Sequence, residues 1–363
     1  MEHLPLLFLI VIIIQIGYLF IFDLGLFFYR SQQGKVRPVS IVVAARNELK
    51  NLQSLVPALL SQDHPEFEVI IVDDQSTDDT LKYLETMKGN DSLKVLSIQG
   101  TPDNVNRKKY AVQKGIEQAS NDIILLTDAD CRIKSDQWAA IMSSSYHDHT
   151  EIVIGISTYL KRKGLLNRFI RYETLMTALQ YLSLASLKIP YMGIGRNLSY
   201  KKSFFIRQKG FEGIESINGG DDDLFVNKNA TGRTTNISFS PNTLVLSVPK
   251  TSWTAYFGQK RRHLAIGKYY KIRDKLILGA FHLTAILVWL LAILLAFTGF
   301  DPYIILIGLG ARWWFLMLTL DTILKKTGEQ FEIGYIYILD FLYSLYYITA
   351  GFAGLFFKND RWN

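Results

Sequence analysis

The stretch "DIILLTDADCRI" (residues 122–133) decides how the middle of this chain folds. Its first half is a short apolar run that indicates a buried β-strand, and the run ends in Asp128 and Asp130. Side chains two residues apart in a strand point the same way, so alternation predicts that both carboxylates share one side. Two interpretations stay open: a solvated strand end that caps the next element, or a site for a divalent cation that bridges to a phosphate.

Other short apolar runs resemble this one and alternate with helical segments. Runs typical of buried strands are "VSIVVAARN" (39–47), "FEVIIVDDQS" (67–76) and "LKVLSI" (93–98). Helical spacing is found between the strands, in residues 48–62, 77–88 and 108–119. This alternation predicts an α/β fold with a doubly wound, mostly parallel sheet.

Polar side chains gather where the predicted strands end. They are Arg46, Asn47 and Glu48 after the first strand, Asp73 and Asp74 after the second, and Asp128 and Asp130 after the fourth. Ligands of such sheets bind beyond the carboxyl ends of the strands. One acidic strand end is commonplace, but three on one rim favour a binding site over a solvated edge.

The two ends of the chain are apolar enough to enter a membrane. At 49% hydrophobic and 20% charged residues, the 363-residue chain is too apolar for a typical soluble enzyme. Candidate spans of adequate length are residues 4–28, 276–300, 303–320 and 333–357. The first has no basic leader and no small-residue cleavage site, which favours an uncleaved anchor. The expected domains are therefore residues 1–30, 36–265 and 266–363, the second lying between membrane segments.

Basic residues flank these spans on the side of the middle segment. Examples are Arg30 and Lys35 after the first span and Lys271 and Lys275 before the second. The positive-inside rule then places residues 36–270 in the cytoplasm of a multi-pass integral membrane protein. We expect a bacterial inner (cell) membrane. The net charge of +7 comes without a nucleic-acid motif, so anionic lipid head groups are the expected partner and nucleic acid is not.

Later motifs carry further chemistry. "MGIGRNLSY" (192–200) is either an ordinary glycine-rich turn or a binding loop. "GGDDDLFVNK" (219–228) puts three carboxylates at the start of a helix, where capping explains one but hardly three. Their mutual repulsion raises at least one carboxyl pKa, as a general base requires. Asp340, inside the last span, is a candidate functional acid.

Together, "SIVVAARNELKNL", "EVIIVDDQSTDDT" and "LLTDADCRI" resemble the first motifs of family 2 glycosyltransferases with the GT-A fold, over roughly residues 36–265. The resemblance implies that Asp73 or Asp74 holds the nucleobase of a nucleotide sugar. It also implies that Asp128 and Asp130 hold the ribose and a diphosphate bound to Mg²⁺ or Mn²⁺, with Asp130 as the main metal ligand. The implied nucleotide-sugar site further includes Ala45, Arg46, Glu48, Gln259 and Arg262.

The resemblance implies roles for the later motifs too. The "GGDDD" carboxylates supply the catalytic base, and matching an E-D-x-D-L pattern selects Asp221, whereas matching an E-D pair selects Asp223; Asp222 lies between them. The acceptor-side residues are Gly195, Arg196, Asn197 and His263. "QKRRH" (259–263) resembles a Q-x-x-R-W motif with His263 in place of Trp, which argues against long-chain processive synthesis; the alternative is a juxtamembrane cluster that binds lipid phosphates.

These observations predict an integral membrane glycosyltransferase of the cell envelope. It would be a hexosyltransferase that moves a sugar from a nucleotide donor, with UDP favoured, to a lipid or lipid-linked acceptor. The resemblance implies that the transfer proceeds with inversion. The alternative within this class is a polysaccharide synthase extending a cell-surface glycan. A transporter is disfavoured because inverted repeats are not evident. A catalytically inactive scaffold is disfavoured because Asp130 and the "GGDDD" carboxylates are retained.

Overall fold

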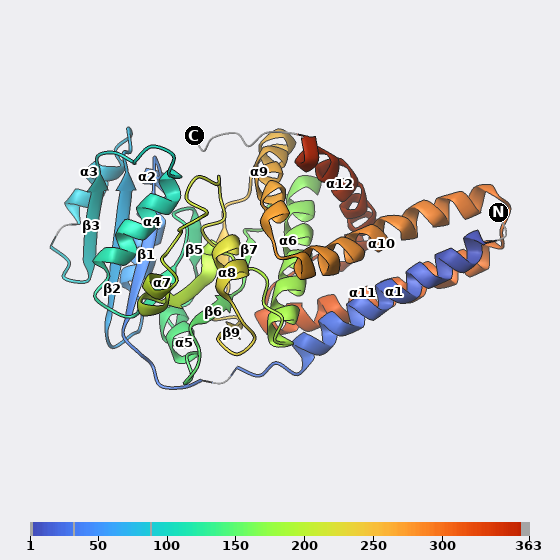
Figure 1. The fold of residues 1–363 in the computed structure, drawn as a ribbon, viewed down its shortest axis with the longest axis horizontal. Coiled ribbons are helices and arrows are strands. Elements are labelled where there is room, and N and C mark those ends of the chain that lie inside the picture. Colours follow the sequence, from blue (N-terminus) through green and yellow to red (C-terminus); the bar gives the residue numbers. More distant parts are fainter. Residues whose placement is uncertain (1–2, 32, 88, 357–363) are drawn as a thin grey trace. The chain divides into compact units, whose positions relative to one another are not determined.

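The chain forms two compact units in the computed structural model, which describes residues 3–31, 33–87 and 89–356, with side chains up to residue 349. One unit, here the membrane-helix unit, holds α1 (Leu4–Phe27), most of α6 (Leu165–Ser186) and the chain from α9 (Trp253–Ile266) to α12 (Ile336–Phe356). The other, here the sheet unit, holds the strands and the remaining helices (Figure 1).

This division differs from the expected boundary at residues 36–265, because two helices inside that range pack with the apolar helices. Lys260 of α9 pairs with Glu173 of α6 at 2.5 Å, both largely buried. Arg171 of α6, 1% exposed, pairs with Glu329 at 2.6 Å in the segment between α11 and α12. Buried ion pairs therefore join α6 to the rest of the membrane-helix unit, and α6 is a core helix of that unit.

Within the described residues, the sheet unit is built on a seven-stranded sheet of order β3-β2-β1-β4-β8-β6-β9. The strands are β1 (Val39–Ala45), β2 (Phe67–Asp74), β3 (Leu93–Ile98), β4 (Ile123–Leu126), β6 (Ile152–Gly155), β8 (Leu198–Lys201) and β9 (Thr235–Ser238). Only β8 runs against its neighbours β4 and β6. A smaller sheet pairs β5 (Cys131–Ile133), β10 (Val245–Ser247) and β7 (Ser157–Tyr159). The predicted α/β, mostly parallel sheet is confirmed.

Helices cover both faces of this sheet. They are α2 (Leu49–Leu60), α3 (Thr80–Thr86), α4 (Arg107–Gln118), α5 (Trp138–Ser144), α7 (Lys202–Arg207) and α8 (Asp223–Asn229). The first three match the predicted helical segments. At Gly115 of α4, an added Cβ would collide with the side chains of Val42 and Val72. The glycine thus lets α4 lie directly on β1 and β2, which carries the start of α4 to the carboxyl ends of these strands.

The strand order reverses between β1 and β4, since β2 and β3 follow on one side of β1 and β4 lies on the other. Open α/β sheets bind ligands at such a point. Here the prediction for Asp128 and Asp130 was wrong in one respect. β4 ends at Leu126, and the two carboxylates lie in a turn closed by a 3.0 Å bond from Cys131 N to Asp128 O. They therefore follow the strand instead of sharing one side of it.

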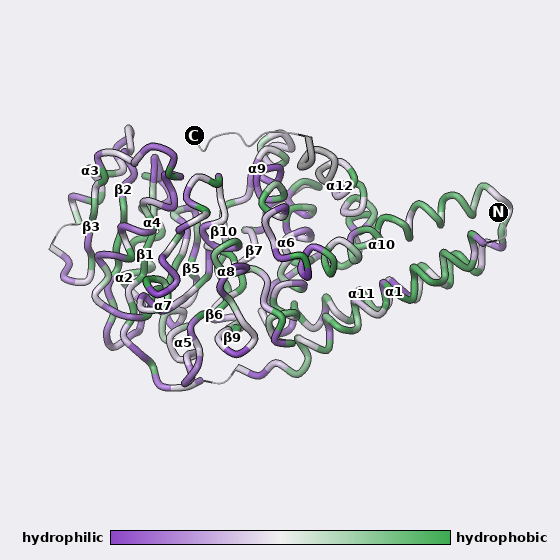
Figure 2. Tube along the Cα trace, in the orientation of Figure 1, coloured by the Kyte–Doolittle hydropathy of each residue, from purple (hydrophilic) through white to green (hydrophobic). Residues whose placement is uncertain are grey.

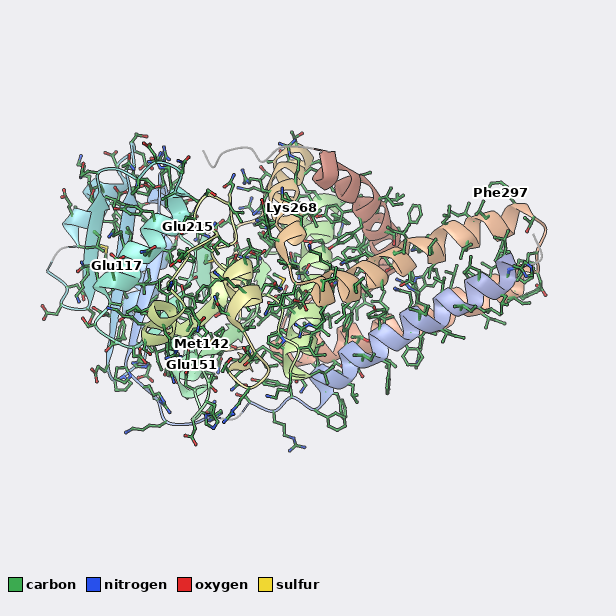
Figure 3. All side chains as sticks on the ribbon, viewed as in Figure 1. Glu117, Met142, Glu151, Glu215, Lys268 and Phe297 are labelled. Atoms are coloured by element: carbon green, nitrogen blue, oxygen red, sulfur yellow. The ribbon has the colours of Figure 1, made fainter. Side chains whose placement is uncertain are left out.

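Three helices of the described residues are long and apolar enough to cross a membrane: α1, α10 (Ile272–Phe297) and α11 (Pro302–Thr327). Figure 2 shows them as largely hydrophobic. Phe8, Val288 and Leu309 pack between them, whereas Ile307 and Phe297 are 71% and 86% exposed. Figure 3 labels Phe297 at the end of α10. Such an apolar exterior suits contact with lipid.

The fourth expected span, residues 333–357, corresponds to α12, which is not among these three helices. The side chains of residues 350–357 of that span lie outside the described residues. A count of four spans therefore stays a prediction.

Asp340 of α12 lies in a buried polar network. Arg312 of α11 donates from Nη1 and Nη2 to its two oxygens at 2.5 and 2.9 Å. Tyr172 and Trp289 also donate to the carboxylate, each at 3.3 Å. Gln15 of α1 accepts from Arg312 Nε at 3.2 Å. The acid that the sequence marks as a functional candidate is thus one half of an internal ion pair between α11 and α12, and hydrogen bonds link this pair to α1, α6 and α10.

Candidate active site

The basic run Arg107-Lys108-Lys109 at the start of α4 connects the acidic motifs of the sheet unit. Its three side chains reach three different targets: Asp74, the Asp128 and Asp221 carboxylates, and the carbonyls of residues 217 and 219. None of these three residues was among the predicted site residues. Cations in the first turn of a helix oppose its dipole, so three in succession were a signal that could have been used.

The neighbouring acids Asp73 and Asp74 differ in their partners. Asp74 accepts from Arg107 Nη2 at 3.3 Å and from Gln75 Nε2 at 3.1 Å. Asp73 accepts from Ser76 N at 3.4 Å through Oδ2, and its buried Oδ1 has no hydrogen-bond partner in the described part of the chain. Alternation along β2 accounts for the difference. The buried Oδ2 of Asp74 also accepts no hydrogen bond among the described residues, but it lies 3.3 Å from Arg107 Nε in an ion pair. Asp73 Oδ1 has neither kind of partner there, so Asp73 is the acid with an oxygen to offer a ligand.

The loop after β1 lies beside the loop after β2. Asn47, in the left-handed region at φ 55°, accepts from Thr77 N at 2.7 Å. Of the predicted nucleotide-site residues, Ala45 is buried at the end of β1 and Arg46 is half-buried. Glu48 accepts from the Asn51 amide at 2.7 Å. The structure thus brings these residues to the same sheet edge as Asp73.

Lys108 joins the Asp-x-Asp turn to the "GGDDD" cluster. Its Nζ lies 3.0 Å from Asp128 Oδ1 and 3.0 Å from Asp221 Oδ2. Burial alone would lower the pKa of Lys108, but the charges of Asp128, Asp221 and Asp222 outweigh burial and raise that pKa well above its usual value. The lysine is a fixed cation between two motifs far apart in the sequence.

The three "GGDDD" carboxylates have different environments. Asp222 caps α8, accepting from Asp223 N at 2.8 Å and from Gly195 N at 2.6 Å. Burial, followed by the charge of Asp221, raises the pKa of Asp222. Burial would also raise the pKa of Asp221, but the nearby Lys108 brings it below its usual value. Asp223 accepts from the Leu224 amide at 2.7 Å.

Two features hold this cluster in place. Gly219 and Gly220 have φ of 86° and 83°, a conformation that side chains disfavour, which explains the glycine pair. The ammonium of Lys109, 1% exposed as a residue, donates to the carbonyl oxygens of Ile217 and Gly219. The loop before α8 is therefore anchored to α4.

The predicted acceptor-side loop is a 3-10 turn, η1 (Gly195–Asn197). Asn197 is fully buried: its amide donates to Ile156 O and Thr243 O at 2.7 Å each and accepts from Trp138 Nε1 at 3.0 Å. Those bonds occupy its side chain inside the fold. Arg196, between these fixed neighbours, is only half-buried. Its side chain is the one in η1 that remains open to a ligand.

The Asp-x-Asp turn fits a divalent cation that is completed by phosphate and water. Asp128 and Asp130 are both half-buried, and Asp130 accepts from Ser247 Oγ at 3.2 Å. No group of three or more His, Cys, Asp or Glu side chains that could hold a metal occurs among the described residues. Mg²⁺ commonly uses one or two carboxylates together with substrate phosphates. Burial raises the pKa of the adjacent Cys131 thiol, which disfavours a thiolate ligand.

The remaining predicted residues belong to the other unit. Gln259, Arg262 and His263 lie on α9, where the first two are half-buried and His263 is exposed. The structure thus divides the predicted site residues between the two units. Their contact with a diphosphate stays a prediction.

Comparison with known proteins relates residues 40–206 to a known family. The family described as Glycosyl transferase family 2 matches residues 40–206. The chain is 33% identical over 108 residues to poly-beta-1,6-N-acetyl-D-glucosamine synthase of Staphylococcus epidermidis, covering 30% of this chain and 25% of that protein. It is 37% identical over 114 residues to beta-monoglucosyldiacylglycerol synthase of Nostoc sp., covering 30% of this chain and 24% of that protein.

Among solved structures, a mannosyltransferase from Pyrobaculum calidifontis in complex with GDP-Man and Mn²⁺ has a TM-score of 0.55 at 18% identity. The match covers 88% of this chain and 98% of the mannosyltransferase. The likeness shows the fold, and the predicted GT-A fold is confirmed. The matched segment spans about a quarter of the length of the curated relatives.

Proposed function

Because residues 40–206 of this chain are a glycosyl transferase family 2 domain, we propose that the protein is a membrane-bound glycosyltransferase. It transfers a sugar from a UDP-sugar to the hydroxyl of a lipid or lipid-linked acceptor, with inversion. The observation that carries this proposal is the position of Lys108, 3.0 Å from both Asp128 and Asp221. One cation thus joins Asp128, which is proposed to help bind the leaving group, to Asp221, which is proposed to accept the proton.

The donor nucleotide is proposed to bind beyond β1, β2 and β4. Asp73 offers its unpartnered buried Oδ1 to the N3–H of uracil, because a buried acceptor without a donor is costly. Asp74 is instead held by Arg107. Asp128 and Asp130 would hold Mg²⁺ or Mn²⁺ against the diphosphate. The cation, when bound, stabilises the negative charge of the leaving diphosphate.

Asp221 is proposed as the general base. As the acceptor oxygen attacks the anomeric carbon, the carboxylate takes the hydroxyl proton and the bond to UDP breaks. Lys108 keeps Asp221 ionised. Asp222 is a weaker candidate because both of its oxygens already accept backbone N–H groups. Asp222 thereby positions Gly195 and the start of α8.

The acceptor is proposed to be membrane-borne because the same chain carries three helices able to cross a membrane. A relative named for synthesis of beta-monoglucosyldiacylglycerol favours a lipid acceptor. A polysaccharide synthase remains the second candidate, because another relative is named for synthesis of a poly-N-acetylglucosamine. Gln259 and Arg262 would add donors to the diphosphate, and His263 lacks the broad indole face that a processive enzyme would use.

Incubation of membranes containing the protein with a panel of radiolabelled nucleotide sugars tests this function. We expect label from one UDP-sugar in the organic phase, at an initial rate roughly 100-fold or more lower with the matched variant Asp221→Asn. Label in a water-soluble polymer would select the synthase. No incorporation from any nucleotide sugar, with folded protein present, would overturn the proposal.

A further inference from the structure

Arg196 is a half-buried cation of the sheet unit without an anionic partner among the described residues. Its Nη1 is buried and has no hydrogen-bond partner in the part of the chain that the structure describes. No carboxylate oxygen of the described residues lies within 4.0 Å of the Arg196 guanidinium nitrogens, the distance that defines an ion pair. The guanidinium lies over the ring of Tyr159, 4.5 Å from its centroid. A buried donor without an acceptor is costly, so this side chain suits a ligand that supplies one.

The backbone on both sides of Arg196 is fixed. Gly195 N donates to Asp222 at 2.6 Å, and the amide of Asn197 makes three hydrogen bonds within the fold. The Tyr159 ring, 4% exposed, supports the guanidinium from one face. A stacked guanidinium keeps its N–H groups in the plane of the fork, available to an oxyanion. The Arg196 guanidinium is therefore preorganised before any ligand binds.

The surroundings of Arg196 indicate where such a ligand would lie. The charges of Asp130 and Asp128 act on the guanidinium, although neither carboxylate pairs with it. Gly195, one residue before it, contacts the "GGDDD" cluster through Asp222. The Arg196 side chain thus lies near the proposed diphosphate site, and the residue before it contacts the cluster that contains the proposed base.

We propose that Arg196 is an oxyanion-binding residue that takes a charged oxygen of a substrate through a charge-assisted hydrogen bond. This inference rests on the proposed function for its ligand class. Two substrates carry the required chemistry: the diphosphate of the donor, and a phosphate on the acceptor. The resemblance that suggested an acceptor-side role for Arg196 did not imply an anionic ligand.

The matched control for Arg196 is Arg132 of β5. Arg132 is also half-buried, but its guanidinium donates to Asn51 Oδ1 and Cys131 O at 2.8 Å each. We would compare Arg196→Gln, Arg196→Lys and Arg132→Gln in the full-length protein in detergent with Mn²⁺. Binding of inorganic pyrophosphate, inorganic phosphate, UDP and uridine would be measured by calorimetry, and unfolding by a thermal scan.

We expect Arg196→Gln to weaken binding of pyrophosphate or phosphate about 10-fold or more, the scale of one lost charge-assisted hydrogen bond. Uridine has no oxyanion, so the affinity of Arg196→Gln for uridine should be within about 2-fold of the wild-type affinity. Arg196→Lys should retain part of the affinity because it keeps the charge. The unfolding midpoint of Arg196→Gln should not fall, since an unpaired cation is removed, whereas that of Arg132→Gln should.

The source of the oxyanion follows from the other ligands. A parallel loss for UDP assigns Arg196 to the donor diphosphate. Unchanged UDP affinity, with phosphate slowing label transfer by the wild type but not by Arg196→Gln, assigns it to the acceptor. The inference is overturned if both anions bind Arg196→Gln as they bind Arg132→Gln, or if Arg196→Gln is the less stable variant. Failure of the wild type to bind any nucleotide sugar would instead refute the proposed function, and the pyrophosphate result would still decide the role of Arg196.

Discussion

Removing the carboxylate of Asp340 should destabilise the membrane-helix unit strongly. The carboxylate and the Arg312 guanidinium have side chains 1% and 2% exposed, with N to O distances of 2.5 and 2.9 Å. Asp340→Ala therefore leaves a buried cation without a counterion. Breaking a buried pair in this way costs about 3–5 kcal/mol. At about 2–4 °C per kcal/mol for a domain of this size, the unfolding midpoint should fall by roughly 6–20 °C.

Replacing both partners should behave differently. Arg312→Met with Asp340→Leu removes the pair and fills its volume with apolar groups, which is often neutral or stabilising. We expect the double variant to recover most of the lost stability. An exposed ion pair on α11, the helix of Arg312, serves as the control. It joins Lys325 to Asp321 at 2.5 Å, and the two side chains are 75% and 47% exposed. Lys325→Gln should change stability by less than about 1 kcal/mol, because exposed pairs contribute little.

The assay is thermal unfolding of the purified protein in detergent, followed by tryptophan fluorescence and by loss of soluble monomer. The reasoning is refuted if the unfolding midpoint of Asp340→Ala lies within about 2 °C of the wild-type midpoint. Such a shift corresponds to a loss of less than about 1 kcal/mol in the free energy of unfolding. A double variant as unstable as the single variant would also refute the reasoning, because the network would then stabilise the unit through interactions other than the ion pair. Such a result would restore Asp340 as a functional acid.

The remaining predictions concern the proposed site and the topology. Asp221→Asn should retain UDP binding and lose roughly 100-fold or more in rate, the scale of general-base removal; full activity in a single-turnover assay would place the base elsewhere. Lys108→Gln should weaken UDP binding as well as slow transfer, and a variant with normal UDP affinity in calorimetry would contradict the link to the diphosphate. Asp130→Ala should abolish turnover, and full wild-type activity in EDTA would exclude the metal assignment. After replacement of Cys131, a cysteine introduced near position 100 should resist an impermeant thiol reagent in intact cells; labelling there would reverse the proposed cytoplasmic orientation.

Local patterns were enough to predict the framework of the sheet unit. Buried strands such as β1 and β2 appear as continuous apolar runs, and their helices appear through spacing, because both signals depend only on neighbouring residues. The apolar lengths of α1, α10 and α11 are likewise properties of the chain alone. The acidic strand ends could be collected at one edge because parallel strands all end there.

The partners within the site could not be predicted in this way. Asp73 and Asp74 are equivalent by sequence, and only the position of Arg107 on another element shows which of them is already paired. The bridge from Lys108 to Asp128 and Asp221 joins three segments whose proximity depends on the strand order.

The same limit holds for the charged residues outside the proposed site. Asp340 is an isolated acid in the sequence, and it becomes one half of an ion pair only when α11 and α12 pack together. Arg196 is one more arginine until the fold shows that no described carboxylate pairs with it. The sequence by itself determined which groups are present and which element carries each one. The tertiary structure alone decided which charges are neutralised, because Coulomb and hydrogen-bond energies depend on distance in space and not on separation along the chain.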